Sequence, residues 1–97
     1  MLVNVRTHHL DITAALKEYA KKKLVKLDRF FENIQEITIE LDISSASDEN
    51  KRQIANAIVK ASGVLIRAEE ANKDMYASID GIFDKLEAQL LKLFKIN

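Results

Sequence analysis

Apolar and polar residues alternate strictly from Glu36 to Ile43 within the segment IQEITIELDI, residues 34–43. Its apolar residues lie two positions apart and share one face: Ile37, Ile39, Leu41 and Ile43. This alternation predicts a β-strand with one buried and one solvated face. Residues 2–8 alternate in the same way, with Val3 and Val5 on one face, and residues 52–61 and 63–71 are predicted to be strands as well. Ser62 and Gly63 join the last two segments, which indicates a hairpin turn.

Two other segments repeat their apolar residues at the spacing of an α-helix. The first helix is expected from Ala14 to about Glu32, with Thr13 as its N-cap. Its apolar stripe, within about 60° of one direction, consists of Ile12, Leu16, Tyr19, Ala20, Leu27, Phe30 and Phe31. The second helix is expected from the N-cap Asp74 to about Lys95. Its stripe consists of Met75, Ile79, Ile82, Phe83, Leu86, Leu90 and Leu93.

The order of these elements, β-α-β-β-β-α, predicts an α+β fold in which residues 1–97 form a single domain. The last three strands should form an antiparallel meander, whereas the first strand is followed by a helical crossover and should pair in parallel. Each helix has one stripe to bury, so both should pack on one face of a four-stranded mixed sheet. We expect the covered face to include Val3, Val5, Ile37, Ile39, Leu41, Val59, Ile66 and Ala68.

The composition is that of an ordinary soluble protein. Apolar residues make up 47% and charged residues 31% of the chain, unlike a disordered protein. The absence of cysteine excludes disulfides and thiolate metal sites. No apolar run reaches the roughly 18 residues of a membrane span, and the polar residues among the first ten argue against a signal peptide. We therefore expect a cytoplasmic protein with no membrane partner.

Residues that could support catalysis or hold a metal are scarce. His8 and His9 are the only histidines, and neighbours on a strand point to opposite faces, so they should not chelate one ion. Thr7, His9 and Asp11 have the residue types of a catalytic triad, but a polar strand end is the simpler interpretation. The sequence contains no glycine-rich phosphate loop. We expect no enzyme activity, cofactor, metal or small-molecule substrate.

Basic residues concentrate on the two predicted helices, although the chain carries 15 basic and 15 acidic side chains and no net charge. On the first helix, Lys22, Lys26 and Arg29 fall on one flank of the apolar stripe, and Lys23 lies near the middle of the stripe. If the helices lie side by side, this flank could border a shared basic groove with a flank of the second helix. That second flank carries Lys85, Gln89 and Lys92.

Lys23 is the least expected of these residues. Burying a lone ammonium costs several kcal/mol, so its head must reach water or meet an anion. A groove between the helices would allow the stem to pack and the charge to face outward, and a row of phosphates would supply the anions. The alternative is that both basic flanks are ordinary solvated helix faces.

Four stretches of the sequence resemble the ribosome hibernation-promoting factors. This family includes the ribosome-associated translation inhibitor and was once called the sigma-54 modulation proteins. The stretches are HHLDITAALKEY, KKLVKLDRFF, SGVLIRAEEANKDMYASID and DGIFDKLEAQLLK. The block DMYASID with the following DKL is the most specific, because amphipathicity alone does not dictate its residues. The resemblance spans nearly the whole chain and agrees with the predicted order of elements.

The resemblance implies a function for the chain. Such proteins bind the small ribosomal subunit and its rRNA near the decoding centre, where mRNA and tRNA would lie, and so inhibit translation. They promote or stabilise inactive ribosomes in stationary phase or stress. Short forms act with ribosome modulation factor, and a chain that ends at Asn97 resembles the short form.

The resemblance also implies RNA-binding residues. The positions that match the family's contacts are Lys23, Lys26, Lys85, Gln89 and Lys92, and geometry alone adds Lys22 and Arg29. Ala88 departs from the family pattern, which usually has arginine before the glutamine. Two alternatives stay open: a general double-stranded-RNA-binding domain, and a protein-interaction module that docks through Leu91, Phe94 and Ile96.

Overall fold

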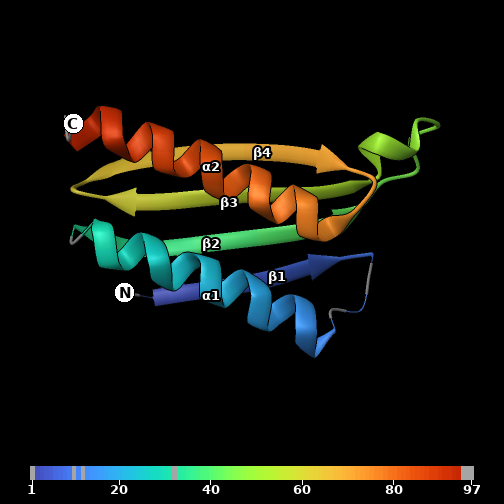
Figure 1. The fold of residues 1–97 in the computed structure, drawn as a ribbon, viewed down its shortest axis with the longest axis horizontal. Helices are drawn as coiled ribbons and strands as arrows, with labels where there is room; N and C mark the ends of the chain where they lie inside the picture. The colour runs from blue at the N-terminus through green and yellow to red at the C-terminus, as the bar shows by residue number, and fades with distance from the viewer. Residues whose placement is uncertain (1, 10, 12, 32, 95–97) are drawn as a thin grey trace.

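Two helices lie across one face of a four-stranded sheet in the computed structural model, which describes residues 2–9, 11, 13–31 and 33–94 (Figure 1). The strands are β1 (Leu2–His8), β2 (Ile34–Ile43), β3 (Gln53–Ala61) and β4 (Val64–Asn72). The helices are α1 (Ala14–Phe30) and α2 (Met75–Phe94), and a 3-10 turn (Glu49–Lys51) lies in the loop before β3. None of the described helices is long and apolar enough to cross a membrane.

The sheet has the strand order β1-β2-β3-β4. β1 pairs with β2 in parallel, and β3 pairs antiparallel with both β2 and β4. The predicted α+β fold with the order β-α-β-β-β-α is confirmed. These pairings make β1 and β4 run in the same direction. Because each helix follows one of these strands, α1 and α2 start at the same end of the sheet and run parallel to each other (Figure 1).

The predicted hairpin turn and both predicted helix starts are present. Thr13 accepts a hydrogen bond at 3.1 Å from the backbone N–H three residues later. Asp74 accepts one at 3.1 Å from the N–H two residues later, so each residue satisfies a free amide of the first helical turn. Ser62 and Gly63 have φ values of 49° and 77°, the two positive angles that a two-residue hairpin turn needs.

The core lies between the sheet and the helices, and alternation along each strand decides which residues enter it. The buried residues of the sheet include Ile34, Ile37, Ile39, Leu41, Ala55, Ala57, Val59, Ala61 and Ile66. Within the face predicted to be covered, Val3, Val5 and Ala68 are half-buried and the others are buried. Ile43 and Val64 continue the apolar alternation but are 37% and 42% exposed, because each is the terminal residue of its strand.

The buried stripe of α1 is rotated from the predicted one. Its buried residues are Ala20, Leu24 and Leu27, followed by the C-cap Phe31. The prediction omitted Leu24 and centred the stripe near Lys23, because it treated the helix as having one neighbour. The Leu24 side of α1 faces the sheet, whereas the side that carries Lys23 is half-buried and faces α2. Outside the described residues lie Ile12, Glu32, Lys95 and Ile96, as does the side chain of Phe30.

α2 packs closely over β3 and β4 because small residues lie on both sides of the contact. β3 presents Ala55 and Ala57 to the core. The buried Ser78 hydroxyl donates a hydrogen bond of 2.6 Å to the carbonyl of Gln53, so this polar group is satisfied. Gly81 has no side chain, and a Cβ there would clash with the side chain of Glu70. The larger residues that α2 buries are Met75, Ile79, Ile82, Leu86 and Leu90.

The orientation of α1 can be tested by two neighbouring substitutions. Leu24 is 1% exposed, so Leu24→Ala should lower the free energy of unfolding by about 2–5 kcal/mol. Val25 is 46% exposed, so Val25→Ala should change it by no more than about 0.5 kcal/mol. Denaturant titration of both variants measures the difference. Equal effects would show that α1 does not turn Leu24 toward the sheet.

Candidate nucleic-acid interface

Lys23 lies at the contact between the two helices, and the anion beside its ammonium is a carboxylate of the chain itself. Its Nζ is 3.3 Å from Oδ1 of Asp80 on α2. The same Nζ lies 5.6 Å from the ring centroid of Tyr19 and 5.4 Å from that of Phe83, within the range of cation–π attraction. The Lys23 side chain is only 28% exposed. Its stem therefore packs between the helices, and its charge is balanced internally.

Asp80 also accepts a hydrogen bond of 2.5 Å from the Tyr19 hydroxyl, on the same Oδ1 that faces Lys23. Tyr19 packs edge-on against Tyr76, with ring centroids 5.0 Å apart. The hydrogen bond from Tyr19, and then the contact with Lys23, lower the pKa of Asp80 below its ordinary value of 3.8. The contact with Asp80 raises the pKa of Tyr19 and of Lys23. Each group thus keeps, at neutral pH, the charge state that favours the contact.

Lys85 and Gln89 lie on a different flank of α2, above the edge of the sheet. Nζ of Lys85 donates a hydrogen bond of 2.7 Å to the backbone carbonyl of Glu69 and is 3.1 Å from the carboxylate of Glu70. Nε2 of Gln89 donates one of 2.8 Å to the carbonyl of Arg67. Because β4 is an edge strand, its outer carbonyls have no neighbouring strand to bind. We call Lys85 and Gln89 the edge caps.

The two basic flanks therefore do not border a shared groove. The contact of Lys23 with Asp80 identifies the flank of α2 that faces α1. The edge caps lie on the other flank, toward β4. Lys92 follows Lys85 by seven residues, which places it on that outer flank, and it is exposed. The predicted RNA-binding residues thus form one group on α1 and another on the far flank of α2.

The exposed part of the first group is a row of three cations on α1, which we call the basic row: Lys22, Lys26 and Arg29. Their spacing of i, i+4 and i+7 places them on one side of the helix. Within the part of the chain that the structure describes, no carboxylate forms an ion pair with any of the three. Their charges are therefore free to meet an external anion.

A row of acids, which the sequence interpretation missed, lies on the neighbouring face of α2. This acidic row consists of Asp80, Asp84 and Glu87 and has the same i, i+4 and i+7 spacing as the basic row. The contact between Asp80 and Lys23 shows that this face turns toward α1. Asp84 and Glu87 are exposed, and Asp84 lies close enough to contribute to the raised pKa of Lys23. The surface between the helices is thus basic on the α1 side and acidic on the α2 side.

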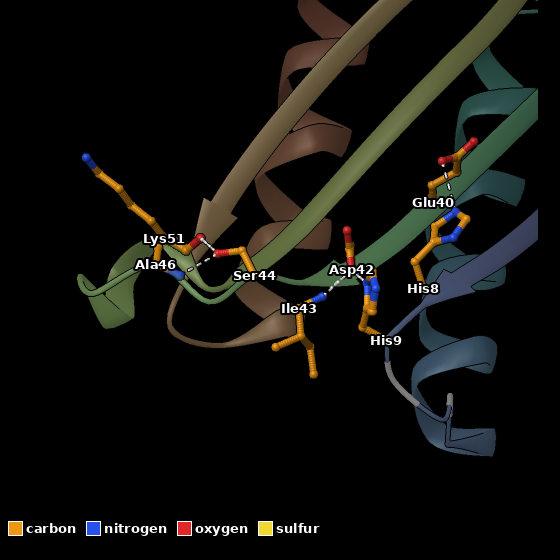
Figure 2. Close-up of polar contacts among 8 residues, drawn as sticks. All are labelled: His8, His9, Glu40, Asp42, Ile43, Ser44, Ala46 and Lys51. Carbon is orange, nitrogen blue, oxygen red and sulfur yellow. Dashed lines mark hydrogen bonds and ion pairs between the residues drawn. The ribbon is translucent and has the colours of Figure 1, made fainter.

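The two histidines contact carboxylates of β2 (Figure 2). His8 Nε2 lies 3.2 Å from Glu40 Oε2, and His9 Nδ1 lies 2.9 Å from Asp42 Oδ1, which lowers the pKa of Asp42. Both histidines reach acids two residues apart on one strand because β1 ends at His8, and His9, with φ of 61°, lies in the turn that follows. Among the described residues, no group of three or more potential ligands is arranged to hold a metal ion.

The contact of Tyr19 and Lys23 with Asp80 predicts a pH dependence of stability. Because the pKa of Asp80 is depressed, its contribution is present above the ordinary value of 3.8 and is lost as the pH falls through the folded-state value. The melting temperature of Asp80→Asn should lie below that of the wild type between about pH 5 and pH 8. The gap should narrow as the pH falls below 3.8.

Asp84→Asn is the matched control, since it removes a carboxylate one turn further along α2. Asp84 is exposed and forms no ion pair within the described part of the chain. The melting temperature of Asp84→Asn should stay closer to that of the wild type than the melting temperature of Asp80→Asn does, both at neutral and at acidic pH. If the difference in melting temperature between the wild type and Asp80→Asn stays constant down to about pH 3, the charge of the Asp80 carboxylate makes no net contribution to stability.

The fold and the sequence both match known proteins over nearly the whole chain. Residues 3–95 match the family described as Sigma 54 modulation protein / S30EA ribosomal protein. The chain is 38% identical over 92 residues to the ribosome hibernation promoting factor of Klebsiella oxytoca, a match that covers 95% of this chain and 92% of that protein.

Two solved structures share the fold. One is a ribosomal subunit interface protein from Coxiella burnetii, with 31% identity, a TM-score of 0.84, and coverage of 98% of this chain and 99% of the other. The second is the N-terminal domain of Thermus thermophilus Protein Y, with 31% identity, a TM-score of 0.81, and coverage of 96% and 99%. On these grounds the chain belongs to the Sigma 54 modulation protein / S30EA ribosomal protein family.

Proposed function

We propose that this chain is a ribosome hibernation factor that binds the small ribosomal subunit through its rRNA and inhibits translation. The names of its relatives support this: one is a ribosome hibernation promoting factor and another a ribosomal subunit interface protein. The proposed site lies near the decoding centre and overlaps the positions of mRNA and tRNA. Binding there would keep ribosomes inactive in stationary phase or stress, with ribosome modulation factor as a proposed partner.

The basic row of α1 is the observation that carries the proposal. Lys22 and Arg29 are separated by about 10 Å along the helix axis. The row can therefore follow the phosphates of a short stretch of one RNA strand, and phosphate contacts are among the features by which proteins recognise duplex RNA. The acidic row beside it and the zero net charge of the chain disfavour loose binding to any polyanion. Shape and charge together would then select the site.

The outer flank of α2 supplies a second proposed contact. Lys92 is exposed at the end of this flank and is available to a phosphate directly. Lys85 and Gln89 already donate hydrogen bonds to β4, so they would bind RNA only by exchanging these bonds for new ones. We therefore expect Lys92 to contribute more to binding than either edge cap.

Two alternatives are weaker. A general double-stranded-RNA binder would use the same basic row, and equal affinity for plain duplex RNA and for small subunits at one salt concentration would favour it. A protein-docking module would use Leu91 and Phe94. Phe94, however, is half-buried and stacks on Phe31 at a centroid distance of 6.1 Å, so it is engaged within its own chain.

The basic row predicts the salt dependence of binding to purified small subunits. Lys26→Ala should weaken binding and make the slope of log affinity against log salt shallower by about 0.7–0.9, because one phosphate contact is lost. Lys21→Ala removes the same charge from a position about 140° around the helix and is the control. Filter binding at four or more salt concentrations measures both slopes. Identical slopes for the two variants would show that the basic row does not touch RNA.

The proposed site also predicts competition with tRNA. Because both ligands would occupy the same region of the small subunit, saturating tRNA should displace the protein in co-sedimentation, and excess protein should displace tRNA. The Lys26→Ala variant should displace less tRNA at equal concentration. Full binding of the protein to tRNA-saturated subunits would place its site elsewhere.

A further inference from the structure

Tyr19 and Lys23 converge on one carboxylate oxygen at the contact between the helices. Oδ1 of Asp80 accepts the Tyr19 hydroxyl at 2.5 Å and lies 3.3 Å from the Lys23 ammonium. Tyr19 and Lys23 are one turn apart on α1, so both reach the same side of α2. Two rings, one from each helix, lie within 6 Å of the ammonium. The ammonium is thus held by groups of both helices.

The surroundings of Lys23 do not favour a phosphate. Asp80 occupies the position beside the ammonium that an external anion would take, and Asp84 adds a second negative charge close by. A phosphate at Lys23 would have to displace a hydrogen-bonded carboxylate and approach another. The basic row, by contrast, makes no ion pair with any acid in the described part of the chain. Lys23 and its neighbour Lys22 therefore differ in what they can bind.

The position of Lys23 gives it a different use. Apolar contacts of Leu24 and Leu27 hold α1 against the sheet, but apolar packing is not directional and leaves the helix some freedom to roll. Hydrogen bonds, such as the one that Tyr19 donates to Asp80, are directional, and Lys23 pairs with the same carboxylate oxygen. The contact with Asp80 therefore limits the roll of α1, and the roll decides where the basic row points.

We propose that Tyr19, Lys23 and Asp80 form an interhelical lock that orients the basic row. Lys23 is then a positioning residue and makes no RNA contact of its own. This inference rests on the proposed function, in which the basic row binds rRNA. It changes the expected role of Lys23 from a phosphate ligand to a group that acts through Lys22, Lys26 and Arg29.

The first test compares Lys23→Met with Lys26→Met in salt-dependent binding to purified small subunits. Lys26→Met should make the slope shallower by about 0.7–0.9. Lys23→Met should leave the slope unchanged and weaken binding about three- to tenfold, because the ion pair with Asp80 that helps to orient the basic row is lost. A slope that becomes shallower by one contact for Lys23→Met would overturn the proposal.

The second test uses variants whose charge effects can be separated from the lock. Tyr19→Phe changes no charge, and it should weaken binding at an unchanged slope because the hydroxyl that holds Asp80 is lost. Asp80→Asn and Asp84→Asn both remove one negative charge from the acidic row, but only the first breaks the lock. Asp80→Asn should therefore bind less tightly than Asp84→Asn. If Lys23 instead binds a phosphate, Asp80→Asn frees its ammonium and should bind more tightly than Asp84→Asn.

A third measurement, made without ribosomes, separates the lock from the proposed function. Thermal melts of Lys23→Met, Asp80→Asn and the double variant form a double-mutant cycle. Each single variant should melt about 2–6 °C below the wild type, and the double variant should melt no lower than the worse single variant. If the fall in melting temperature of the double variant equals the sum of the falls of the two single variants, Lys23 and Asp80 are not coupled and there is no lock. Wild-type protein that fails to bind small subunits would overturn the proposed function and the positioning role, while the cycle would still decide the lock.

Discussion

The alternating apolar residues of β2 and β3 give the sheet one face that must be shielded from water, and the two helices share the task of covering it. Because β1 and β4 run in the same direction, the helices that follow them start at one end and lie in parallel. Neither helix covers the face alone. The two helices therefore lie side by side, and one flank of each contacts the other helix. That interhelical flank is where the half-buried polar groups Tyr19, Lys23 and Asp80 are found.

The fold could be predicted because its signals are local. Alternation marks each strand, and the caps Thr13 and Asp74 mark both helix starts within a few residues of the amides they bind. The burial of Leu24 could not be predicted in this way. A helical wheel finds the average apolar direction of one helix, whereas α1 presents a buried side to the sheet and a half-buried side to the second helix. Lys23 fell within the predicted stripe only because the wheel averaged the side of α1 that faces the sheet with the side that faces α2.

The candidate site was predicted in part. Spacing alone identified Lys22, Lys26 and Arg29 as one exposed flank, and all three are exposed. Spacing could not show that Lys23 meets Asp80, which lies 57 residues later, nor that Lys85 and Gln89 turn toward β4. Such pairings depend on tertiary geometry. They leave a surface in which a cationic strip on α1 and an anionic strip on α2 lie side by side, so a polyanion has one favourable line of approach.

The edge caps have a consequence for how the protein behaves in a crowded solution. An uncovered outer strand is a template on which another chain can add a strand of its own, and that reaction leads to aggregation. In β4 the carbonyls of Arg67 and Glu69 are already occupied by side chains of α2. An incoming strand would have to displace both donors before it could pair along this stretch of β4. The last helix thus covers the core and also protects the β4 edge of the sheet against polymerisation.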